Sequence, residues 1–186
     1  HQTMITDAGL HYLRNLTELA QLGLSWTSIG DAGLVHLREL KKLQRVWLGN
    51  TNISGPGLRH FSTLPALYSL TLDWTKIDDS GLAYVSDLTG LKQLGVSYTS
   101  ITDSGLLHIK NLMGLTELGI KGNHIKGSGL TYLSQLPFLQ ELDLYHTEVS
   151  DDGLANIQGL TKLKTLDLNR TPITDAGLIY LQWLTK

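Results

Sequence analysis

Apolar residues recur along the 186-residue chain with a period of 24, and each recurrence opens with a similar stretch. "ITDAGLHYL" begins at Ile5 and "ITDAGLIYL" begins at Ile173. The full series of starts is evenly spaced: Ile5, Ile29, Ile53, Ile77, Ile101, Ile125, Val149 and Ile173. No insertion or change of composition interrupts the series. The pattern predicts one array over residues 1–186, with seven full repeats and a partial eighth.

Each repeat combines two apolar spacings. In "LAQLGLSWTSI", Leu22 and Leu24 alternate with small or polar residues, which is the pattern of a short half-buried strand. Leu10, Leu13 and Leu16 recur instead at helical spacing. One repeat is too small to bury its own leucines. We therefore expect the repeats to stack and to share a continuous core.

An aspartate column marks the corner between strand and helix. Asp7 directly precedes the helical spacing, and aspartate is a favourable N-cap residue. The third repeat has Gly55 there and then Pro56, and proline suits a first helical turn. We interpret the column as helix caps rather than as chemistry: Asp7, Asp31, Asp79, Asp103, Asp151 and Asp175.

The strand pattern L-x-x-L-x-L-x-x-T-x-I resembles a leucine-rich repeat (LRR), and the resemblance covers almost the whole chain. The 24-residue form ITDxGLxxLxxLxxLxxLxLxxT resembles a subclass found in bacterial arrays of the GALA and planctomycete-like types and in F-box proteins. F-box repeats usually carry cysteine where this chain has threonine, so a bacterial array is the nearer resemblance. The resemblance implies an α/β solenoid, or horseshoe, with a parallel sheet on the concave face and short helices on the convex face.

One polar column follows the strand. Asn123 occupies the position where leucine-rich repeats usually carry asparagine, and the other full repeats have threonine. Both side chains can hydrogen-bond the backbone of a turn. We expect a structural role for the whole column: Thr27, Thr51, Thr75, Thr99, Asn123, Thr147 and Thr171.

Aromatic residues gather where the implied concave face would lie. Trp26, Trp47 and Trp74 fall on outward strand positions, and Tyr98 follows in the next repeat. Exposed tryptophan and tyrosine dominate interface hot spots because they combine a large apolar area with a polar group. Two interpretations stay open: the rings anchor a partner, or they pack on neighbouring repeats and shield the strands.

Four carboxylates are expected on adjacent strands of the same face: Glu117, Glu141, Asp143 and Asp167. Like charges at this spacing repel one another. Three interpretations are compatible with the cluster. It is a hydrated acidic surface partly neutralised by nearby cations, a site for a basic segment of a partner, or a Ca²⁺ site, since calcium takes oxygen ligands. The nearby cations are Lys121, Lys164 and Arg170.

Composition restricts the function classes further. A net charge of −2 gives no basic footprint for nucleic acid. The chain has no cysteine, which excludes disulfides, cysteine-based zinc sites and a thiol nucleophile. No stretch approaches the ~20 apolar residues of a membrane helix, and the first residues do not resemble a signal peptide. Localisation stays open between the cytoplasm and a bacterial secreted or surface location.

Arrangements for catalysis are not apparent. Glu141 and Asp143 are close in sequence, but glycoside hydrolysis needs two carboxyls in a cleft, and a solenoid face is broad and shallow. His36 and His60 share a column on the helical side without an accompanying acid. His146 has no nucleophile beside it, and no phosphate-binding loop is present. We expect no enzyme activity, no cofactor and no bound metal.

The sequence predicts a non-catalytic module that recognises a protein through its concave face. The partner could carry a basic segment, and neither nucleic acid nor a membrane is expected. The candidate binding residues are Trp26, Arg45, Trp47, Asp73, Trp74, Tyr98, Glu117, Glu141, Asp143, Tyr145, His146 and Asp167.

Two other functions remain as alternatives: a structural array that stacks through its open ends, and a carbohydrate binder that uses its exposed aromatic rings. The chain is expected to be monomeric or weakly associated end to end. It stops at "LQWLTK", where Trp183 would either shield the last coil or dock a further one. We expect a fragment of a longer array or a naturally truncated one.

Overall fold

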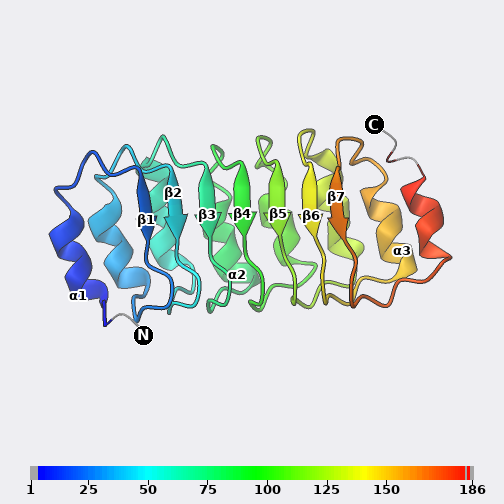
Figure 1. Ribbon diagram of the computed structural model, residues 1–186, viewed down its shortest axis with the longest axis horizontal. Helices are drawn as coiled ribbons and strands as arrows, with labels where there is room; N and C mark the ends of the chain where they lie inside the picture. Colours follow the sequence, from blue (N-terminus) through cyan, green and yellow to red (C-terminus); the bar gives the residue numbers. More distant parts are fainter. Residues whose placement is uncertain (1–3, 183, 185–186) are drawn as a thin grey trace.

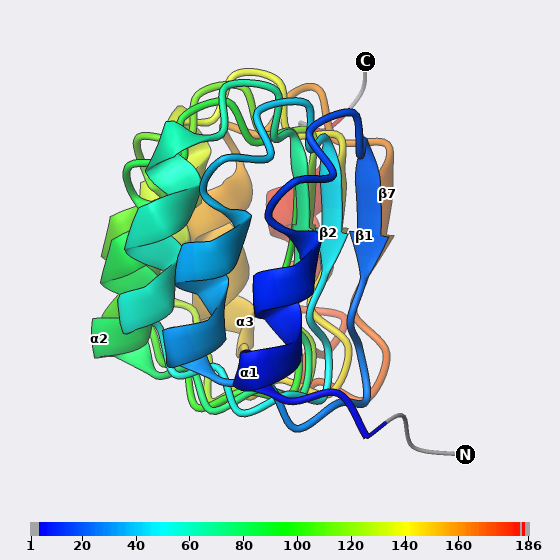
Figure 2. The same cartoon turned by 90° about the vertical axis from the view of Figure 1, so that its left-hand side faces the viewer.

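The computed structural model describes residues 4–182 and 184, which form a parallel sheet and a row of short helices (Figure 1). The helices cover one face of the sheet and leave the other uncovered (Figure 2). Strand β1 pairs with β2 in a register that joins Gln21 to Arg45, one period apart. The predicted α/β solenoid is confirmed. In the described residues the sheet has seven strands in chain order: β1 (Gln21–Gly23), β2 (Arg45–Trp47), β3 (Ser69–Thr71), β4 (Gln93–Gly95), β5 (Glu117–Gly119), β6 (Glu141–Asp143) and β7 (Thr165–Asp167).

The helical layer consists mainly of 3-10 turns. Buried residues in it recur at a spacing of three, as in Leu34, Leu37 and Leu40, and a 3-10 helix has three residues per turn. Short α-helical turns open the first, fourth and seventh repeats: α1 (Asp7–Leu10), α2 (Asp79–Leu82) and α3 (Asp151–Leu154). The 3-10 segments are η1 (His11–Leu13), η2 (Asp31–Leu37), η3 (Pro56–Thr63), η4 (Ala83–Val85), η5 (Gly105–Ile109), η6 (Ser128–Gln135), η7 (Ala155–Ile157) and η8 (Gly177–Leu181). Within the described ranges, these helices are all too short or too polar to cross a membrane.

The core is one continuous stack of aliphatic side chains between the two layers. Leu34, Leu58 and Leu82 occupy the same place in successive repeats, and each is fully buried. Phe61 adds the largest buried side chain of the stack. Each repeat buries its apolar residues against its neighbours, so stability depends on the interfaces between repeats.

The corner aspartates cap the next repeat rather than their own. The turn that begins at Asp31 has Gly30 as its N-cap residue and no side-chain cap. Asp31 instead accepts hydrogen bonds from the backbone N–H groups of Ser54 (2.9 Å), Gly55 (3.1 Å) and Gly57 (2.9 Å). The prediction that each aspartate caps its own helix is wrong, because the carboxylate serves donors one repeat further along. The same inter-repeat bond is made by Asp7, Asp79, Asp103 and Asp151.

Two corners carry glycine in place of aspartate. Gly55 and Gly127 have φ values of +132° and +117°, a region that favours glycine. A Cβ on Gly55 would lie 2.7 Å from the carbonyl oxygen of Gly81, and a Cβ on Gly127 would collide with Gly153. At these two glycine corners, backbone packs directly on backbone, and the corner residue itself supplies no carboxylate to the next repeat.

The polar column after each strand holds the turn, as predicted. The hydroxyl of Thr51 donates to the carbonyl oxygen of Leu48 at 2.7 Å, and the other threonines make the equivalent bond. Asn123 reaches further, because its Nδ2 donates to Val96 (2.8 Å) and Ile120 (2.9 Å) in two different repeats. The expectation for Trp183 concerns a residue outside the described part of the chain.

Candidate functional site

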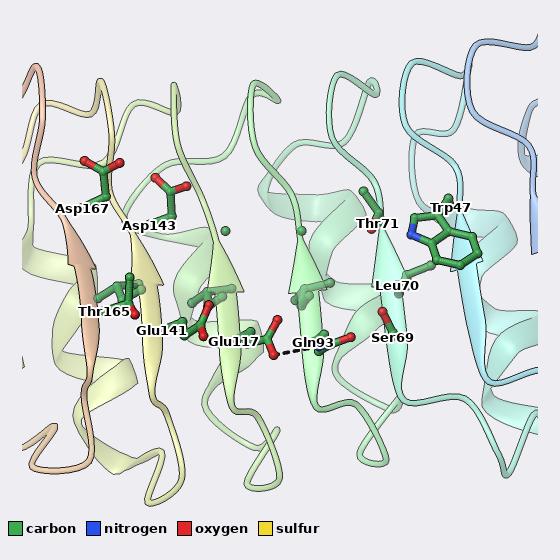
Figure 3. A pocket seen from close by; sticks show the side chains of 15 residues that line it. Trp47, Ser69, Leu70, Thr71, Gln93, Glu117, Glu141, Asp143, Thr165 and Asp167 are labelled. Carbon is green, nitrogen blue, oxygen red and sulfur yellow. Dashed lines mark hydrogen bonds between the residues drawn. The ribbon is translucent and has the colours of Figure 1, made fainter. Parts of the chain in front are cut away.

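A trough runs along the uncovered face of the sheet, across β2 to β7 (Figure 3). Its volume is about 410 Å³. Gly95 and Gly119 have no side chains, so the middle of the trough is open. Trp47 lies toward one end, and Asp143 and Asp167 lie toward the other (Figure 3). This sheet-face trough is therefore hollow in its middle and chemically different at its two ends.

Carboxylates occupy the trough on neighbouring strands. Glu117 on β5 is in register with Glu141 on β6, and Asp143 is in register with Asp167 on β7. Glu117 accepts a hydrogen bond of 2.7 Å from Nε2 of Gln93 (Figure 3). Glu141 is exposed, and no hydrogen bond or ion pair within the described residues reaches its carboxylate. This end of the trough offers negative charge to a ligand.

The two aspartates of the trough also shape their own turns. Asp143 accepts a hydrogen bond of 3.1 Å from the backbone N–H of Tyr145, and Asp167 accepts one of 2.9 Å from that of Asn169. Lys121 forms an ion pair of 2.8 Å with Asp143, and this hydrogen bond raises the pKa of Lys121. Asp143 is therefore partly neutralised, as the sequence suggested for this lysine.

The carboxylate of Asp73 connects two repeats of the fold. Its carboxylate accepts a hydrogen bond of 2.7 Å from the backbone N–H of Ser97 in the next repeat. Burial raises the pKa of Asp73, against the opposing effect of the hydrogen bonds from Ser97. The side chain thus bonds a neighbouring repeat.

Several predicted site residues lie beyond the strands, because each strand is only three residues long. Trp26, Trp74, Tyr98 and His146 have φ values between +53° and +62°, in the left-handed region. Their placement on outward strand positions is wrong: the chain has already turned. We call this column the turn edge: Trp26, Asn50, Trp74, Tyr98, Gly122, His146 and Arg170.

The rings of the turn edge form separate groups. Trp74 and Tyr98 stack, with ring centroids 4.1 Å apart and an angle of 13° between planes. His146 meets Tyr145 edge-on at 6.0 Å, and Arg170 lies 5.6 Å from the centre of the Tyr145 ring. Most of the predicted site residues therefore lie either in the trough or on the turn edge, and Arg45, Asp73 and Tyr145 lie in neither.

Arg45 is held by a neighbouring repeat. Its Nε donates a hydrogen bond of 2.6 Å to the hydroxyl of Tyr68, and its guanidinium lies 5.3 Å from the centre of that ring. The structure adds Ser69, Gln93 and Thr165 to the trough, which sequence reasoning missed. They share the strand column of Arg45, Glu117 and Glu141, and this shared column is the sequence signal that places them in the trough.

The histidines of the helical side lie apart from the carboxylates of the trough. In residues 4–182 and 184, no group of three or more His, Asp, Glu or Cys side chains is placed to hold an ion. His36 packs edge-on against His11, with centroids 5.7 Å apart. Burial and the charges of Arg59 and Arg38 lower the pKa of His60.

Comparisons with known proteins agree with the architecture. A family model described as Leucine Rich repeat matches residues 135–157 and 159–181. No curated protein matches the chain. The structure of an internalin (inlF) from Listeria monocytogenes str. 4b F2365 is similar over 100% of this chain and 56% of the internalin, with 25% identity and a TM-score of 0.73. The chain therefore spans little more than half of that protein.

Two further structures share the fold. An internalin C2 (inlC2) from the same Listeria strain covers 93% of this chain and 78% of its own length, with 25% identity and a TM-score of 0.66. The plant peptide hormone receptor RGFR1, in complex with RGF2, covers 94% and 32%, with 20% identity and a TM-score of 0.62. None of these descriptions names an enzyme. Two stretches of the chain thus match the leucine-rich-repeat model, and the chain folds as a leucine-rich-repeat solenoid.

Proposed function

We propose that the chain is a non-catalytic recognition module that binds an extended segment of a protein in the sheet-face trough. The observation that carries this proposal is the trough itself, open in the middle and bounded by Trp47 and by acidic side chains. It crosses six strands, so its length is roughly 24 Å at ~4.8 Å per strand spacing. About seven residues of extended chain would span that length.

The charge of the trough favours a segment with lysine or arginine. Glu117 and Glu141 would face such a residue together, and a cation between them would relieve the repulsion of two carboxylates in register. Trp47 would anchor an apolar side chain of the same segment, because buried tryptophan dominates hot spots. The RGFR1 structure supports the proposal only as an example of the same fold in a peptide hormone receptor.

We also propose that the repeats belong to the 24-residue subclass of bacterial arrays rather than to that of F-box proteins. Threonine in place of cysteine in the turn column and the likeness to two Listeria internalins support this placement.

The test is a selection of random 12-residue peptides displayed on phage against the immobilised chain. We expect enriched peptides to carry lysine or arginine and to bind less tightly as salt rises. Trp47→Ala and the double variant Glu117→Gln/Glu141→Gln should each weaken binding at least about tenfold. Glu39→Gln, an exposed glutamate outside the trough lining, is the matched control. Selected peptides that bind both trough variants as tightly as the wild type would reject the trough as the site.

A structural array that stacks through its ends is the competing role. It requires a mass that rises steeply with concentration, whereas the recognition module needs only a monomer or weak association. Sedimentation equilibrium over a hundredfold range of protein concentration separates the two.

A further inference from the structure

Two tryptophans of the turn edge occupy an unfavourable backbone conformation without the compensation of burial. Trp26, Trp74 and Tyr98 have φ values of +62°, +60° and +53°. Positive φ suits glycine and asparagine, which fill this column at Gly122 and Asn50, and it is rare for bulky residues. Trp26 and Trp74 are nevertheless 60% and 57% exposed. The turn has a positive φ in every repeat of the column, as His146 and Arg170 also show, but burial does not account for tryptophan at Trp26 and Trp74.

The backbone that carries the rings is held by hydrogen bonds to the next repeat. The backbone N–H of Trp26 donates to the carbonyl oxygen of Gly49 at 2.9 Å, and that of Trp74 donates to Ser97 at 2.8 Å. The ring of Tyr98 stacks on Trp74 and on its other side covers Gly122, where a Cβ would collide with it. These contacts fix the Trp74–Tyr98 pair before any ligand arrives, and such preorganisation lowers the cost of binding.

Uncharged polar groups surround Trp26. A hollow of about 150 Å³ adjoins its ring and is lined by Ser28, Asn50 and Asn52 among other residues, none of which is charged. The hollow offers hydroxyl and amide groups, which both donate and accept hydrogen bonds. Its chemistry is unlike that of the acidic trough, so the two sites would take different ligands.

We infer that the N-terminal part of the turn edge, from Trp26 through Asn50 to Trp74, is a binding site for a neutral saccharide. A pyranose ring has apolar C–H faces that stack on aromatic rings and a rim of hydroxyls that pair with amides and hydroxyls. Trp26 and Trp74 are two repeats apart, roughly 10 Å at ~4.8 Å per strand spacing. Two rings at this separation would contact different parts of one oligosaccharide.

Other occupants fit less well. A charged ligand would find no counter-charge in the hollow beside Trp26. A proline-rich peptide also stacks on aromatic grooves, but its backbone offers carbonyl groups alone and would leave part of the hydrogen-bonding capacity of Ser28, Asn50 and Asn52 unused. That peptide is the second arm of the experiment.

The experiment is isothermal titration calorimetry of the whole chain with cellohexaose, chitohexaose, mannohexaose and decaproline. The variants are Trp26→Asn and Trp74→Asn, because asparagine accepts the left-handed backbone and already occupies this column at Asn50. Trp47→Ala is the matched control, since Trp47 lies in the trough. Each variant is first checked for unchanged melting.

We expect at least one hexasaccharide to bind, with little dependence on salt because no charge is involved. Each turn-edge variant should weaken that binding at least about tenfold, and Trp47→Ala should leave it unchanged. The inference is overturned if no hexasaccharide binds, if binding survives both turn-edge variants, or if decaproline alone binds through the two rings. Loss of peptide binding to the trough would not affect this result.

Discussion

The carboxylate of Asp103 accepts a hydrogen bond of 2.6 Å from the backbone N–H of Gly129, which lies in the following repeat. Asp31 stands in the same relation to Gly57. An N-cap normally belongs to the helix that it stabilises. In this chain the cap is supplied by the preceding repeat, so the local structure of one unit depends on the side chain of another.

Removing such a carboxylate should cost as much as removing an ordinary helix cap. We expect Asp31→Ala and Asp103→Ala each to lower the free energy of unfolding by about 1–2 kcal/mol, because several N–H donors lose their acceptor. Asp87→Ala, at an exposed aspartate of the helical side, should change it by less than about 0.5 kcal/mol. Urea denaturation followed by circular dichroism measures the difference. Equal stability of Asp31→Ala and Asp87→Ala would contradict the inter-repeat cap.

The same carboxylate makes stability depend on pH. Burial raises the pKa of Asp31, but hydrogen bonds from Ser54, Gly57 and Gly55 outweigh it and hold the pKa below its ordinary value of 3.8. A lowered pKa in the folded state gives stability that is present above pH 3.8 and lost as the pH falls below it. The stability difference between wild type and Asp31→Asn should therefore shrink between about pH 5 and pH 2. Denaturation curves across that range would show a constant difference if the carboxylate were unimportant.

The pKa of Asp73 is shifted in the opposite direction, upward. Its pKa is raised mainly by burial, so the ionised form is the unfavourable one in the folded protein. Stability linked to this group is present below pH 3.8 and is lost as the pH rises through the folded pKa. Asp73→Asn keeps an acceptor for Ser97 and removes the charge, so the variant should be more stable than wild type at pH 7, by less than about 1 kcal/mol. The advantage should vanish at pH 3. If Asp73→Asn were less stable than the wild type at pH 7, this prediction would be contradicted.

Asn123 is the most heavily bonded residue of its column. It is 2% exposed, and its amide bonds two backbone carbonyls and both the N–H and the hydroxyl of Thr99. Asn123→Ala removes the amide partner of the Ile120 carbonyl oxygen and of the Thr99 N–H, whereas the Val96 carbonyl oxygen keeps the hydroxyl of Thr99, so the loss should be about 2–4 kcal/mol. Asn123→Thr should recover part of the loss, because threonine bonds the turn in the neighbouring repeats. Thermal melting ranks the three proteins, and an alanine variant as stable as the threonine variant would argue against the bonding.

Each repeat also has a glycine two residues after the corner position, such as Gly9 and Gly57, and it should be required only where a preceding repeat packs against it. A Cβ on Gly57 would lie 2.7 Å from Cα of Asp31, whereas a Cβ on Gly9 finds its nearest neighbour at 3.8 Å, the Cγ2 of Ile5. We expect Gly57→Ala to destabilise the chain by more than about 2 kcal/mol and Gly9→Ala to be neutral or slightly stabilising. Melting temperatures measure both, and similar values for the two variants would refute this account.

The 24-residue period of the sequence was sufficient to predict most of the fold. Equal spacing of Ile29, Ile53 and the other starts specified a stacked array, and the leucine columns identified the core. The bonds of the threonine and asparagine column also followed from the sequence. These features are repeated seven or eight times, so a single ambiguous residue could not change the interpretation.

The ends of the strands and the type of each helical turn were harder to predict from the sequence. Trp26 is two residues beyond Leu24, so a longer strand would turn its side chain toward the core. It is exposed instead, because the strand ends at Gly23 and the chain turns through a positive φ at Trp26. The strict spacing of three at Leu34, Leu37 and Leu40 fits a 3-10 turn. In so short a segment it also resembles one face of an α-helix, so the sequence did not separate the two.

The site was less predictable than the fold. Sequence columns put Glu117 beside Glu141 correctly, since register follows from the period. They could not show that Asp73 turns toward Ser97 or that Arg45 bonds Tyr68, because these contacts depend on side-chain rotamers across repeats. They also could not separate the trough from the turn edge, which lie side by side in sequence.

The glycine corners have a consequence for how the chain comes apart. Corner carboxylates link the second repeat to the third and the fifth to the sixth, whereas Gly55 and Gly127 supply no carboxylate at their corners, and the third repeat is bonded to the fourth by Asp73 outside the corner. The two corners are 72 residues apart, so they mark seams after the third and the sixth repeats. Opening of the solenoid should stop at these seams, and amide hydrogen exchange should change in steps of three repeats rather than fading evenly from the ends.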